Sequence, residues 1–499
     1  MRRVIIALGL CAVTWVPASG ATLYVNNSGS PACSDATAKA SNAAGSPWCS
    51  IGRAAWGSTT RSSPNTSEAA AAGDTVLVTG GTYSSAETTA DNWAVLYNPA
   101  NSGSVGNYIT FTCVGACTLV AEGGAYAAIG ADTRDYIKWY ADVTLGYAWS
   151  IQACALTTAP TGCPDDFVLP DQGLGPVLCH DVTACWIEGV TIDGGPNIDW
   201  ADNYNGVRAE FCASCTFRNL TIRDFRLSGG NHNQSCVTFY GVANGVSEYV
   251  TCSNAGSGIF FKDTGITPEQ SGNRVRYWLI DTVNEGIAFS QTSEDRNYIY
   301  QNIITNVEYG FKVVGGGNSN DWIFNNVFYA MSSGCVGHNA AGSGARFWNN
   351  ICLSSTADMV DITGGANMPA DTVLDHEHNV YSDYATTFYS GTTTRTFANY
   401  KSTYTDQDQA TPASVDADPL FVDAAGGDFR LCTGSGTPAA GCSGASPAIN
   451  LGVDHDDLDG DASTSDAINA GVYVTGSETF GAQSSSSSAP RRLRIRGEH

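Results

Sequence analysis

The chain has 499 residues, with 24 Lys and Arg against 48 Asp and Glu, and a formal net charge of −24 at pH 7. Nucleic acid and anionic membrane surfaces would repel such a chain, which argues against both as partners. A polyanionic glycan would be repelled too, unless bound cations or a local basic patch reversed the sign. The charge alternatively reflects solubility or adaptation to high salt, where screening shortens these fields.

The first 21 residues predict a secretory signal peptide. Two arginines precede an apolar run, Val4 to Val16, that is too short to span a membrane, and small residues follow it. Cys11 belongs to this removed segment, because a lipoprotein signal would place a small residue where Leu10 stands. We therefore expect a secreted or cell-surface protein, extracellular or periplasmic.

The remaining cysteines number 17 − 1 = 16, an even count that fits an oxidising compartment. Many lie close to a second cysteine in the sequence, and these local pairs are Cys33/Cys49, Cys113/Cys117, Cys154/Cys163, Cys179/Cys185, Cys236/Cys252, Cys335/Cys352 and Cys432/Cys442. Cys212 and Cys215 remain. Zinc is the alternative for this last pair, but a second CxxC or a nearby His pair is missing, so a disulfide is the favoured reading.

Short apolar runs follow in chain order. Residues 50–56 predict a short amphipathic helix that plugs one end of the core, and GDTVLV at 73–78 predicts the first inward-facing strand. Further strands are expected between Asn107 and Leu145. Residues 146–177, rich in proline, predict a disulfide-stapled insertion that leaves the regular pattern.

The clearest repeat lies between Tyr298 and Cys352. Asn302, Asn326 and Asn350 have matching apolar flanks and equal spacings (326 − 302 = 24 and 350 − 326 = 24). The runs between breaks are too short for helices and rich in β-branched and aromatic residues. A period of this length predicts stacked coils, here an all-β, right-handed parallel β-helix, with the asparagines in a ladder roughly 4.8 Å apart.

Both ends of the chain resemble secreted proteins of the pectate-lyase-like β-helix superfamily. The matching phrases are PWCSI at 47–51, GDTV at 73–76, GGTY at 80–83, DPLFV at 418–422, GDFRL at 427–431, SPAIN at 446–450 and INAG at 468–471. The resemblance implies an N-terminal cap with the first coil at 22–83, a β-helix over 84–480 and a terminal coil at 415–475. Residues 481–499, Ser-rich with a basic end, predict a disordered tail.

Side chains alternate along strands, so the coil-starting strands can be divided into inward and outward columns. The predicted strand starts are Val207, Cys236, Ile259, Ile287, Phe311, Cys335 and Val360. We take the first residue of each strand to point inward, as Val207, Ile259, Ile287, Phe311 and Val360 do. The second column is then Arg208, Val237, Phe260, Ala288, Lys312, Val336 and Asp361. The fourth column is Glu210, Phe239, Lys262, Ser290, Val314, His338 and Thr363.

The resemblance implies that this outward face carries a polysaccharide cleft, and lyase-like β-elimination on an acidic polysaccharide is the function it favours. Elimination needs carboxylate neutralisation, a base and an acid. Lys262 and Lys312, two coils and roughly 10 Å apart, with His338 or Arg208 for proton transfer, are the candidate catalytic residues. Candidate substrate-binding residues are Phe239, Tyr240, Phe260, Ser290 and Asp361. The alternative is that these residues only decorate a solvated sheet.

Other functions stay open. Polygalacturonase-type β-helix hydrolases carry NTD, DD, GHG-like and RIK motifs on successive coils, and this sequence lacks the set. Glu210, Asp263 and Asp361 leave other glycoside hydrolases open. A non-enzymatic adhesin or glycan-binding solenoid is the alternative of a different class.

The acidic run DHDDLDGD resembles a calcium loop, with Asp454, Asp457, Asp459 and Asp461 as candidate ligands. The closing Glu of an EF-hand is absent, and a solvated turn is the alternative. Calcium, structural or bridging the substrate, is the only cofactor that the sequence suggests.

Overall fold

The computed structural model describes residues 20–87, 94–121, 125–155, 167–169, 175–195, 203–226, 233–262, 270–290, 296–314, 321–338, 345–356, 358–361, 374–385, 387–391, 393–403, 408, 412–434, 442–454, 467–473 and 478–483. Most of the predicted signal peptide and most of the predicted tail therefore lie outside the described residues. Within the described ranges, no helix has the length and apolar character needed to cross a membrane.

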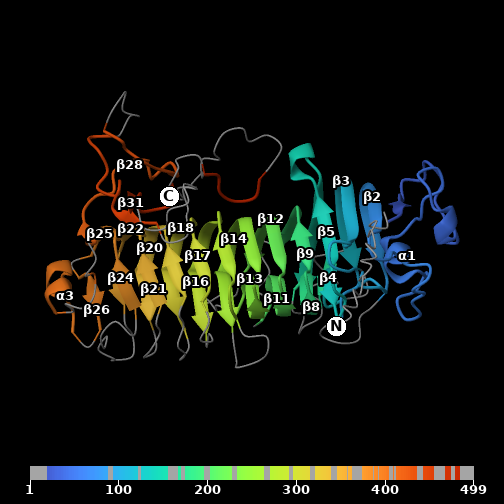
Figure 1. Cartoon of the computed structure of the whole chain (residues 1–499), viewed down its shortest axis with the longest axis horizontal. Helices are drawn as coiled ribbons and strands as arrows, with labels where there is room; N and C mark the ends of the chain where they lie inside the picture. Colours follow the sequence, from blue (N-terminus) through green and yellow to red (C-terminus); the bar gives the residue numbers. More distant parts are fainter. Residues whose placement is uncertain are drawn as a thin grey trace, which may run out of the picture.

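The strands wind into a stack of coils joined by parallel pairing, which confirms the predicted parallel β-helix (Figure 1). Each regular coil contributes one strand or half-strand to each of three faces, here called the first, second and third sheets. Strands of the first sheet are β4 (Ile129–Asp132), β8 (Val177–Thr183), β11 (Asn205–Ala213), β13 (Ser235–Ala243), β23 (Val360–Asp361), β26 (Tyr389–Ser390) and the C-terminal parts of β14 (Val246–Lys262), β16 (Leu279–Ser290), β18 (Ile303–Val313) and β20 (Val327–His338).

The other two faces follow the same order. The second sheet contains β1 (Thr22–Val25), β5 (Ile137–Ala141), β9 (Trp186–Glu188), β15 (Arg274–Arg276), β17 (Tyr298–Tyr300), β19 (Trp322–Phe324), β21 (Ala345–Trp348), β24 (Leu374–Glu377) and the first parts of β2 (Thr75–Ser85), β3 (Ile109–Ala121), β12 (Thr216–Phe225) and β14. The third contains β6 (Ala148–Ala155), β7 (Phe167–Leu169), β10 (Val190–Asp193), β22 (Ile351–Ser355), β25 (Val380–Tyr384), β27 (Val415–Asp416) and the remaining parts of the long strands.

The asparagine ladder is present at the corner between the second and third sheets. Asn302 Nδ2 donates to Asn326 Oδ1 (2.9 Å), and Asn326 Nδ2 donates to Asn350 Oδ1 (3.0 Å). Asn379 continues the ladder, accepting from the backbone N–H of Asn350 at 2.8 Å. All four side chains are buried, so the ladder satisfies polar groups that water does not reach. The predicted ladder is confirmed and extends by one coil.

The residue before each ladder asparagine has a left-handed backbone. Gln301, Asn325 and Asn349 have φ of 53°, 53° and 55°, a region that Asn tolerates better than most residues. Their side chains hold the C-terminal segment: Asn325 Nδ2 donates to the carbonyl of Asn469 (2.9 Å), and Asn349 Nδ2 to that of Val453 (2.7 Å). The two amides of each Asn-Asn pair thus have different partners.

The C-terminal segment, including β28 (Phe421–Asp423), β29 (Asp428–Leu431), β30 (Gly452–Val453) and β31 (Ala467–Ile468), lies along the upper side of the stack in Figure 1. It packs on outward side chains of the third sheet. Ile303, Val327, Ile351 and Val380 form one register column there and join Phe429 and Val472 in a hydrophobic cluster separate from the main core. The segment therefore covers an apolar outer surface.

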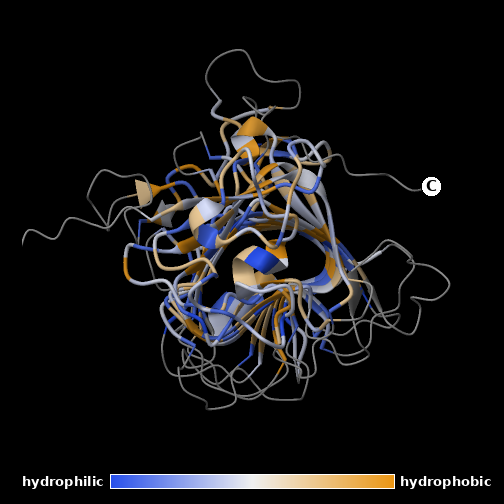
Figure 2. Ribbon diagram, turned by 90° about the vertical axis from the view of Figure 1, so that its right-hand side faces the viewer, coloured by the Kyte–Doolittle hydropathy of each residue, from blue (hydrophilic) through white to orange (hydrophobic). Residues whose placement is uncertain are grey.

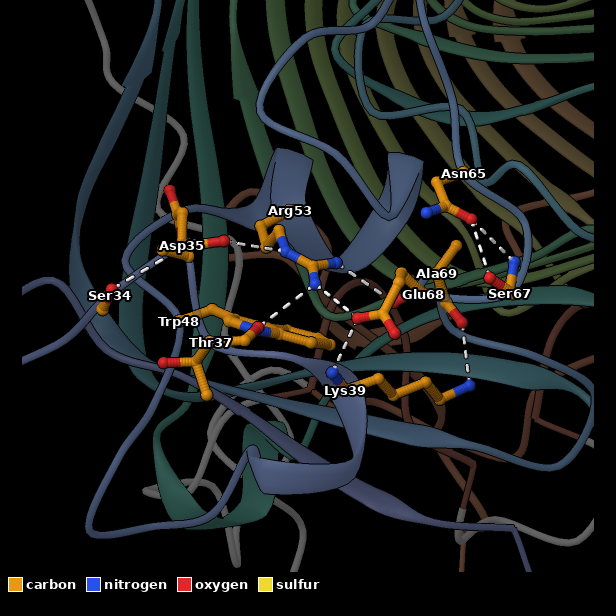
Figure 3. A network of polar contacts seen from close by, with 11 residues as sticks. Ser34, Asp35, Thr37, Lys39, Trp48, Arg53, Asn65, Ser67, Glu68 and Ala69 are labelled. Atoms are coloured by element: carbon orange, nitrogen blue, oxygen red, sulfur yellow. Dashed lines mark hydrogen bonds and ion pairs between the residues drawn. The ribbon is translucent and has the colours of Figure 1, made fainter.

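The N-terminal cap is the predicted helix, α1 (Ile51–Trp56), which closes one end of the stack in the end view of Figure 2. The Ser50 side chain accepts from the N–H of Arg53, and Gly57 ends the helix with a φ of 69°. Arg53 then pairs with Glu68 at 2.7 Å (Figure 3). Hydrogen bonds from the Lys39 backbone N–H and from Arg53 lower the pKa of Glu68.

Seven disulfides lie within the described residues, and they join six of the predicted local pairs together with Cys212 and Cys215. Cys163 lies outside the described residues. The predicted insertion begins later than residue 146, because Ala148–Ala155 forms β6, which pairs in parallel with β3 and β10.

Candidate functional site

The outward side of the first sheet carries two columns of side chains. The Arg208 column contains Leu178, Arg208, Thr238, Phe260, Ala288, Lys312, Gly337 and Asp361. The His180 column contains Asp132, His180, Glu210, Tyr240, Lys262 and Ser290. Neighbours in a column are one strand spacing apart, roughly 4.8 Å.

The predicted columns contained two register errors. Val237 and Val336 are buried core residues, paired with Val207 and Val360. The predicted strand starts, Cys236 and Cys335, instead occupy the corner position that Gly206 and Gly310 fill in neighbouring coils. Each of these cysteines forms a disulfide within its coil. In these two coils the inward column is occupied by Val237 and Val336, one residue later than predicted.

The two phenylalanines expected to be exposed are buried. Phe239 shifts with Val237 into the inward column and is 0% exposed, with its ring tilted against Phe217 and edge-on to Phe261. Phe260 keeps its predicted column but is 1% exposed. Tyr240 is therefore the partly exposed ring of this group, and the cationic groups of Arg208 and Lys262 lie 5.4 and 5.8 Å from its centroid.

His180 and Asp132 form a pair that the sequence analysis did not select. His180 Nδ1 lies 2.9 Å from Asp132 Oδ1, between directly paired residues of β4 and β8. Such a contact fixes the ring orientation and leaves Nε2 as the other exchanging nitrogen. The signal was present in the sequence: HDVTACWIEG and EFCASCTFRN align at a spacing of 30 residues, which pairs His180 with Glu210.

Arg208 and Glu210 form a buried ion pair beside this dyad. Arg208 Nε lies 2.6 Å from Glu210 Oε2, and the side chains are 9% and 3% exposed. Burial raises the pKa of Glu210, and this effect exceeds the opposing effect of Arg208. Asn205 Oδ1 accepts a second hydrogen bond from Arg208 at 3.3 Å, so the guanidinium is held in place.

Lys312 and Asp361 belong to a second polar group, nearer the C-terminal end of the sheet. Lys312 Nζ lies 3.1 Å from Glu285 Oε1 and 4.3 Å from the centroid of the Tyr309 ring. The Tyr309 hydroxyl donates to Asp361 Oδ2 at 2.7 Å. Burial raises the pKa of Glu285, with Lys312 opposing it. Lys312 and Lys262 stand in different columns, so the structure places them in two groups.

The remaining predicted residues take no part in a described cluster. His338 pairs through its backbone with Val313, in the register of the inward column, and its side chain lies outside the described part of the chain. Asp454 is fully buried, whereas Asp457, Asp459 and Asp461 lie outside the described residues. Ser290 follows Lys262 in the His180 column and is partly buried.

The described carboxylates do not fit a bound cation. Among the described residues no group of three His, Cys, Asp or Glu side chains converges as metal ligands. On the first sheet Glu210, Glu285 and Asp361 already contact Arg208, Lys312 and Tyr309. We therefore derive no chemical step that passes through calcium.

No protein-family model matches the sequence, and no curated protein sequence matches it either. Among solved structures, the chain is similar to pectate lyase Pel9A, with 15% identity, a TM-score of 0.49, and 91% of this chain and 96% of that chain covered. It is also similar to the GH136 lacto-N-biosidase from Eubacterium ramulus, at 12% identity and a TM-score of 0.39, covering 74% and 65% of the two chains.

A third similar structure is the PL6 family polysaccharide lyase Pedsa3628 from Pseudopedobacter saltans, with 12% identity and a TM-score of 0.30. The match covers 76% of this chain and 97% of that chain. At these identities and TM-scores the similarities carry no argument about the chemistry, which rests on the residues themselves. The parallel pairing of the strands is that of the parallel β-helix that the resemblance to the pectate-lyase-like superfamily implied.

Proposed function

We propose that the protein is a secreted, carbohydrate-active β-helix enzyme that cleaves an acidic polysaccharide by β-elimination on the first sheet. The observation that carries the proposal is the His180 column with Arg208 beside it. An oriented imidazole, a fixed guanidinium, a phenol and an ammonium lie on adjacent strands of one outward face. Arg208 and Lys262 balance the carboxylates of Asp132 and Glu210 here, so this face lacks the acidic excess of a chain whose net charge is −24.

In this proposal the substrate carboxylate is neutralised by the N–H groups of Arg208 that remain beside its contacts with Glu210 and Asn205. A guanidinium stays protonated, which makes Arg208 unsuitable as the base that the sequence suggested. Neutralisation makes the proton on the neighbouring sugar carbon, C5, more acidic. Lys262 and Lys312 are placed to bind carboxylates of adjoining sugars along the same face.

His180 and Tyr240 stand one strand step on either side of Glu210, and both rings contact Phe211, at 5.7 and 5.9 Å between centroids. A sugar above Glu210 and Arg208 would lie between them. His180 Nε2 takes the C5 proton, the freed electron pair forms the C4–C5 double bond, and the C4–O4 bond breaks. The Tyr240 hydroxyl gives its proton to the departing oxygen.

Glycoside hydrolysis is the second candidate, favoured by one observation. Asp132 and Glu210 flank His180, two strand steps apart, and roughly 9.6 Å between strands approaches the carboxylate spacing of inverting hydrolases. The raised pKa of Glu210 suits a general acid. The ion pair with Arg208 weighs against this role, since it engages Glu210 Oε2 at 2.6 Å and opposes the rise in pKa.

One assay separates these functions. The mature protein is incubated with polygalacturonate, alginate and chondroitin sulfate, each with and without calcium, and both ultraviolet absorbance and reducing ends are recorded. Elimination produces both signals, and hydrolysis produces reducing ends alone. If neither signal appears with any polymer while the polymers still bind, the enzymatic proposal is wrong and a binding solenoid is supported.

A lysine series tests the placement on the first sheet. Lys262→Ala should lower kcat/KM for the polymer at least tenfold, because an adjoining carboxylate loses its partner. Lys401→Ala is the matched control, since that lysine lies in α3 (Phe397–Thr403) at the C-terminal end and pairs with Asp408. Equal activity of the two variants would place the active site elsewhere.

A further inference from the structure

The second sheet has its own row of aromatic and basic side chains on its outward side. Arg274, Tyr298, Trp322 and Arg346 are direct register neighbours in β15, β17, β19 and β21. Arg296, just before β17, places its guanidinium 3.8 Å from the centroid of the Trp322 ring. We call Arg296, Tyr298, Trp322 and Arg346 the arginine–tryptophan surface.

A buried aromatic layer holds this surface in position. Tyr300, Phe324 and Trp348 are 1%, 1% and 6% exposed and form a hydrophobic cluster separate from the main core. Tyr300 and Phe324 stack at 4.9 Å, and Trp348 lies 5.4 Å from Trp322. The Trp322 indole is therefore packed and only partly exposed, so its position is set before any partner binds.

Two guanidinium groups share the one indole. Arg346 lies 5.0 Å from the Trp322 ring and 4.6 Å from Trp348, in addition to the Arg296 contact. Within the described part of the chain, neither Arg296 nor Arg346 makes a side-chain hydrogen bond or an ion pair. By contrast, Arg218 and Arg276 on the same sheet both pair with Glu248.

Two like charges held at one ring repel each other, and an anion between them would relieve the repulsion. Stacking occupies the flat face of a guanidinium but leaves its N–H edge available for a bidentate carboxylate. Partly exposed rings beside such groups suit the apolar face of a sugar. Three strand steps separate Arg274 from Arg346, roughly 14 Å, which is enough for several sugars of an extended chain.

We propose that the arginine–tryptophan surface is a second binding site for an acidic polysaccharide, distinct from the site on the first sheet. The carboxylates of the polymer bind Arg296 and Arg346, and a sugar ring packs against Trp322 and Tyr298. The inference uses residues of the second sheet alone, so it does not depend on the proposed elimination chemistry. The role of the arginine–tryptophan surface is to keep the protein bound to the polymer.

The test uses the full mature chain carrying His180→Gln, so that polymer is not consumed, and measures the Kd for polygalacturonate. Arg296→Gln with Arg346→Gln should raise the Kd at least tenfold. The matched control is Arg61→Gln with Arg226→Gln, which removes the same charge from other surfaces and should leave the Kd unchanged. Thermal melting of each variant verifies folding, and neutral dextran should bind none of them.

Three results would overturn the proposal. The first is an equal Kd for the Arg296/Arg346 variant and its parent, or an equal loss in the Arg61/Arg226 control. The second is tighter binding of single-stranded DNA than of polygalacturonate, which would identify a nucleic-acid surface. The third is full affinity of Arg296→Lys with Arg346→Lys, because lysines keep the charge but lack the planar fork.

The two proposals can fail separately. When Arg296→Gln and Arg346→Gln are made in the protein that keeps His180, turnover of short uronic-acid oligosaccharides should be unchanged. Affinity for the polymer should still fall. A parallel loss of oligosaccharide turnover would show that the arginine–tryptophan surface belongs to the first-sheet site, which would contradict a distinct second site.

Discussion

Asp132 Oδ1 contacts His180 Nδ1 at 2.9 Å across two paired strands of the first sheet. The contact orients the imidazole, and the proposed proton transfer uses the other ring nitrogen, Nε2. His180→Gln should therefore lower kcat on an acidic polymer by about 10²–10⁴-fold, the usual range for a lost general base. Steady-state kinetics by ultraviolet absorbance provide the measurement.

Asp132→Asn tests whether Asp132 acts through His180. An amide can still accept a hydrogen bond but stabilises the protonated imidazole less, so kcat should fall and the acidic limb of its pH profile should move to lower pH than in the parent. Unchanged kcat and an unchanged pH profile would remove Asp132 from the mechanism. KM should stay near the parent value, because Asp132 is a positioning residue.

The Arg208–Glu210 ion pair should matter for stability as well as binding. Glu210→Leu leaves a nearly buried guanidinium without its counter-charge, and we expect a loss of about 3–5 kcal/mol in the free energy of unfolding. The double change Arg208→Met with Glu210→Leu should recover most of that loss, because it removes both charges. Urea unfolding of the three proteins measures the difference; no recovery in the double variant would contradict this account.

His376 should make stability depend on pH. It is fully buried, and burial lowers its pKa from 6.5 to about 4, while Asp408 opposes the shift. The unfolded imidazole binds a proton more readily than the folded one, so stability is highest above pH 6.5 and falls as the pH drops toward 4. The span of 6.5 − 4 = 2.5 pKa units corresponds to about 3 kcal/mol.

The measurement is the melting temperature at a series of pH values between 4 and 7. His376→Gln should show a flatter dependence than the parent, although its hydrogen bond with the Tyr381 hydroxyl, 2.8 Å in the parent, is altered at every pH. Burial also lowers the pKa of His378, which contributes a slope of the same sign. An identical slope in the parent and the His376 variant would rule out His376 as the source.

The two asparagines of one Asn-Asn pair should respond differently to substitution. Asn326→Ala removes the buried amide that donates to Asn350 and accepts from Asn302, and should cost about 2–4 kcal/mol, since several buried polar groups lose their partners. Asn325→Gly keeps the left-handed backbone but removes the bonds to the carbonyls of Asn469 and Gly471.

We expect the Asn325 variant to lose hydrogen-exchange protection at residues 467–473 with little change in the coils. The Asn326 variant should instead lose protection in β18, β20 and β22 together. Equal effects of the two substitutions on both regions would contradict the separate roles assigned here.

The sequence predicted the coils well because their determinants are local and repeated. The 24-residue spacing of Asn302, Asn326 and Asn350 sets the register, and alternation then gives the inward column. The predicted alternation was wrong in the two strands that contain Cys236 and Cys335. In each, a cysteine occupies the corner position usually held by glycine, so each following side chain of that strand lies on the opposite face of the sheet from the one predicted. Phe239 was misplaced for this reason alone.

The candidate site was harder to predict, because it depends on pairs between coils of unequal length. His180 and Asp132 are 48 residues apart, and no repeat marks that distance. A second ladder, in which Asn273 donates to Asn297 and Asn297 to Asp321, has the same 24-residue spacing and could have been recognised. Alternation along the strand predicted an exposed Phe260, but this side chain is buried. Its burial depends on tertiary contacts, which alternation along a strand does not predict.

The C-terminal segment makes the outer surface of the middle coils depend on residues synthesised much later. Asn325 contacts Asn469 across 144 residues of chain, and Gln301 contacts Val472 across 171. Phe421, Phe429 and Leu451 pack on the same column as Val472, so Ile303, Val327, Ile351 and Val380 lose their whole cover only when residues from 421 onward are missing. A chain interrupted before residue 421 would therefore expose a continuous apolar column on its stacked coils, a surface that favours aggregation during synthesis.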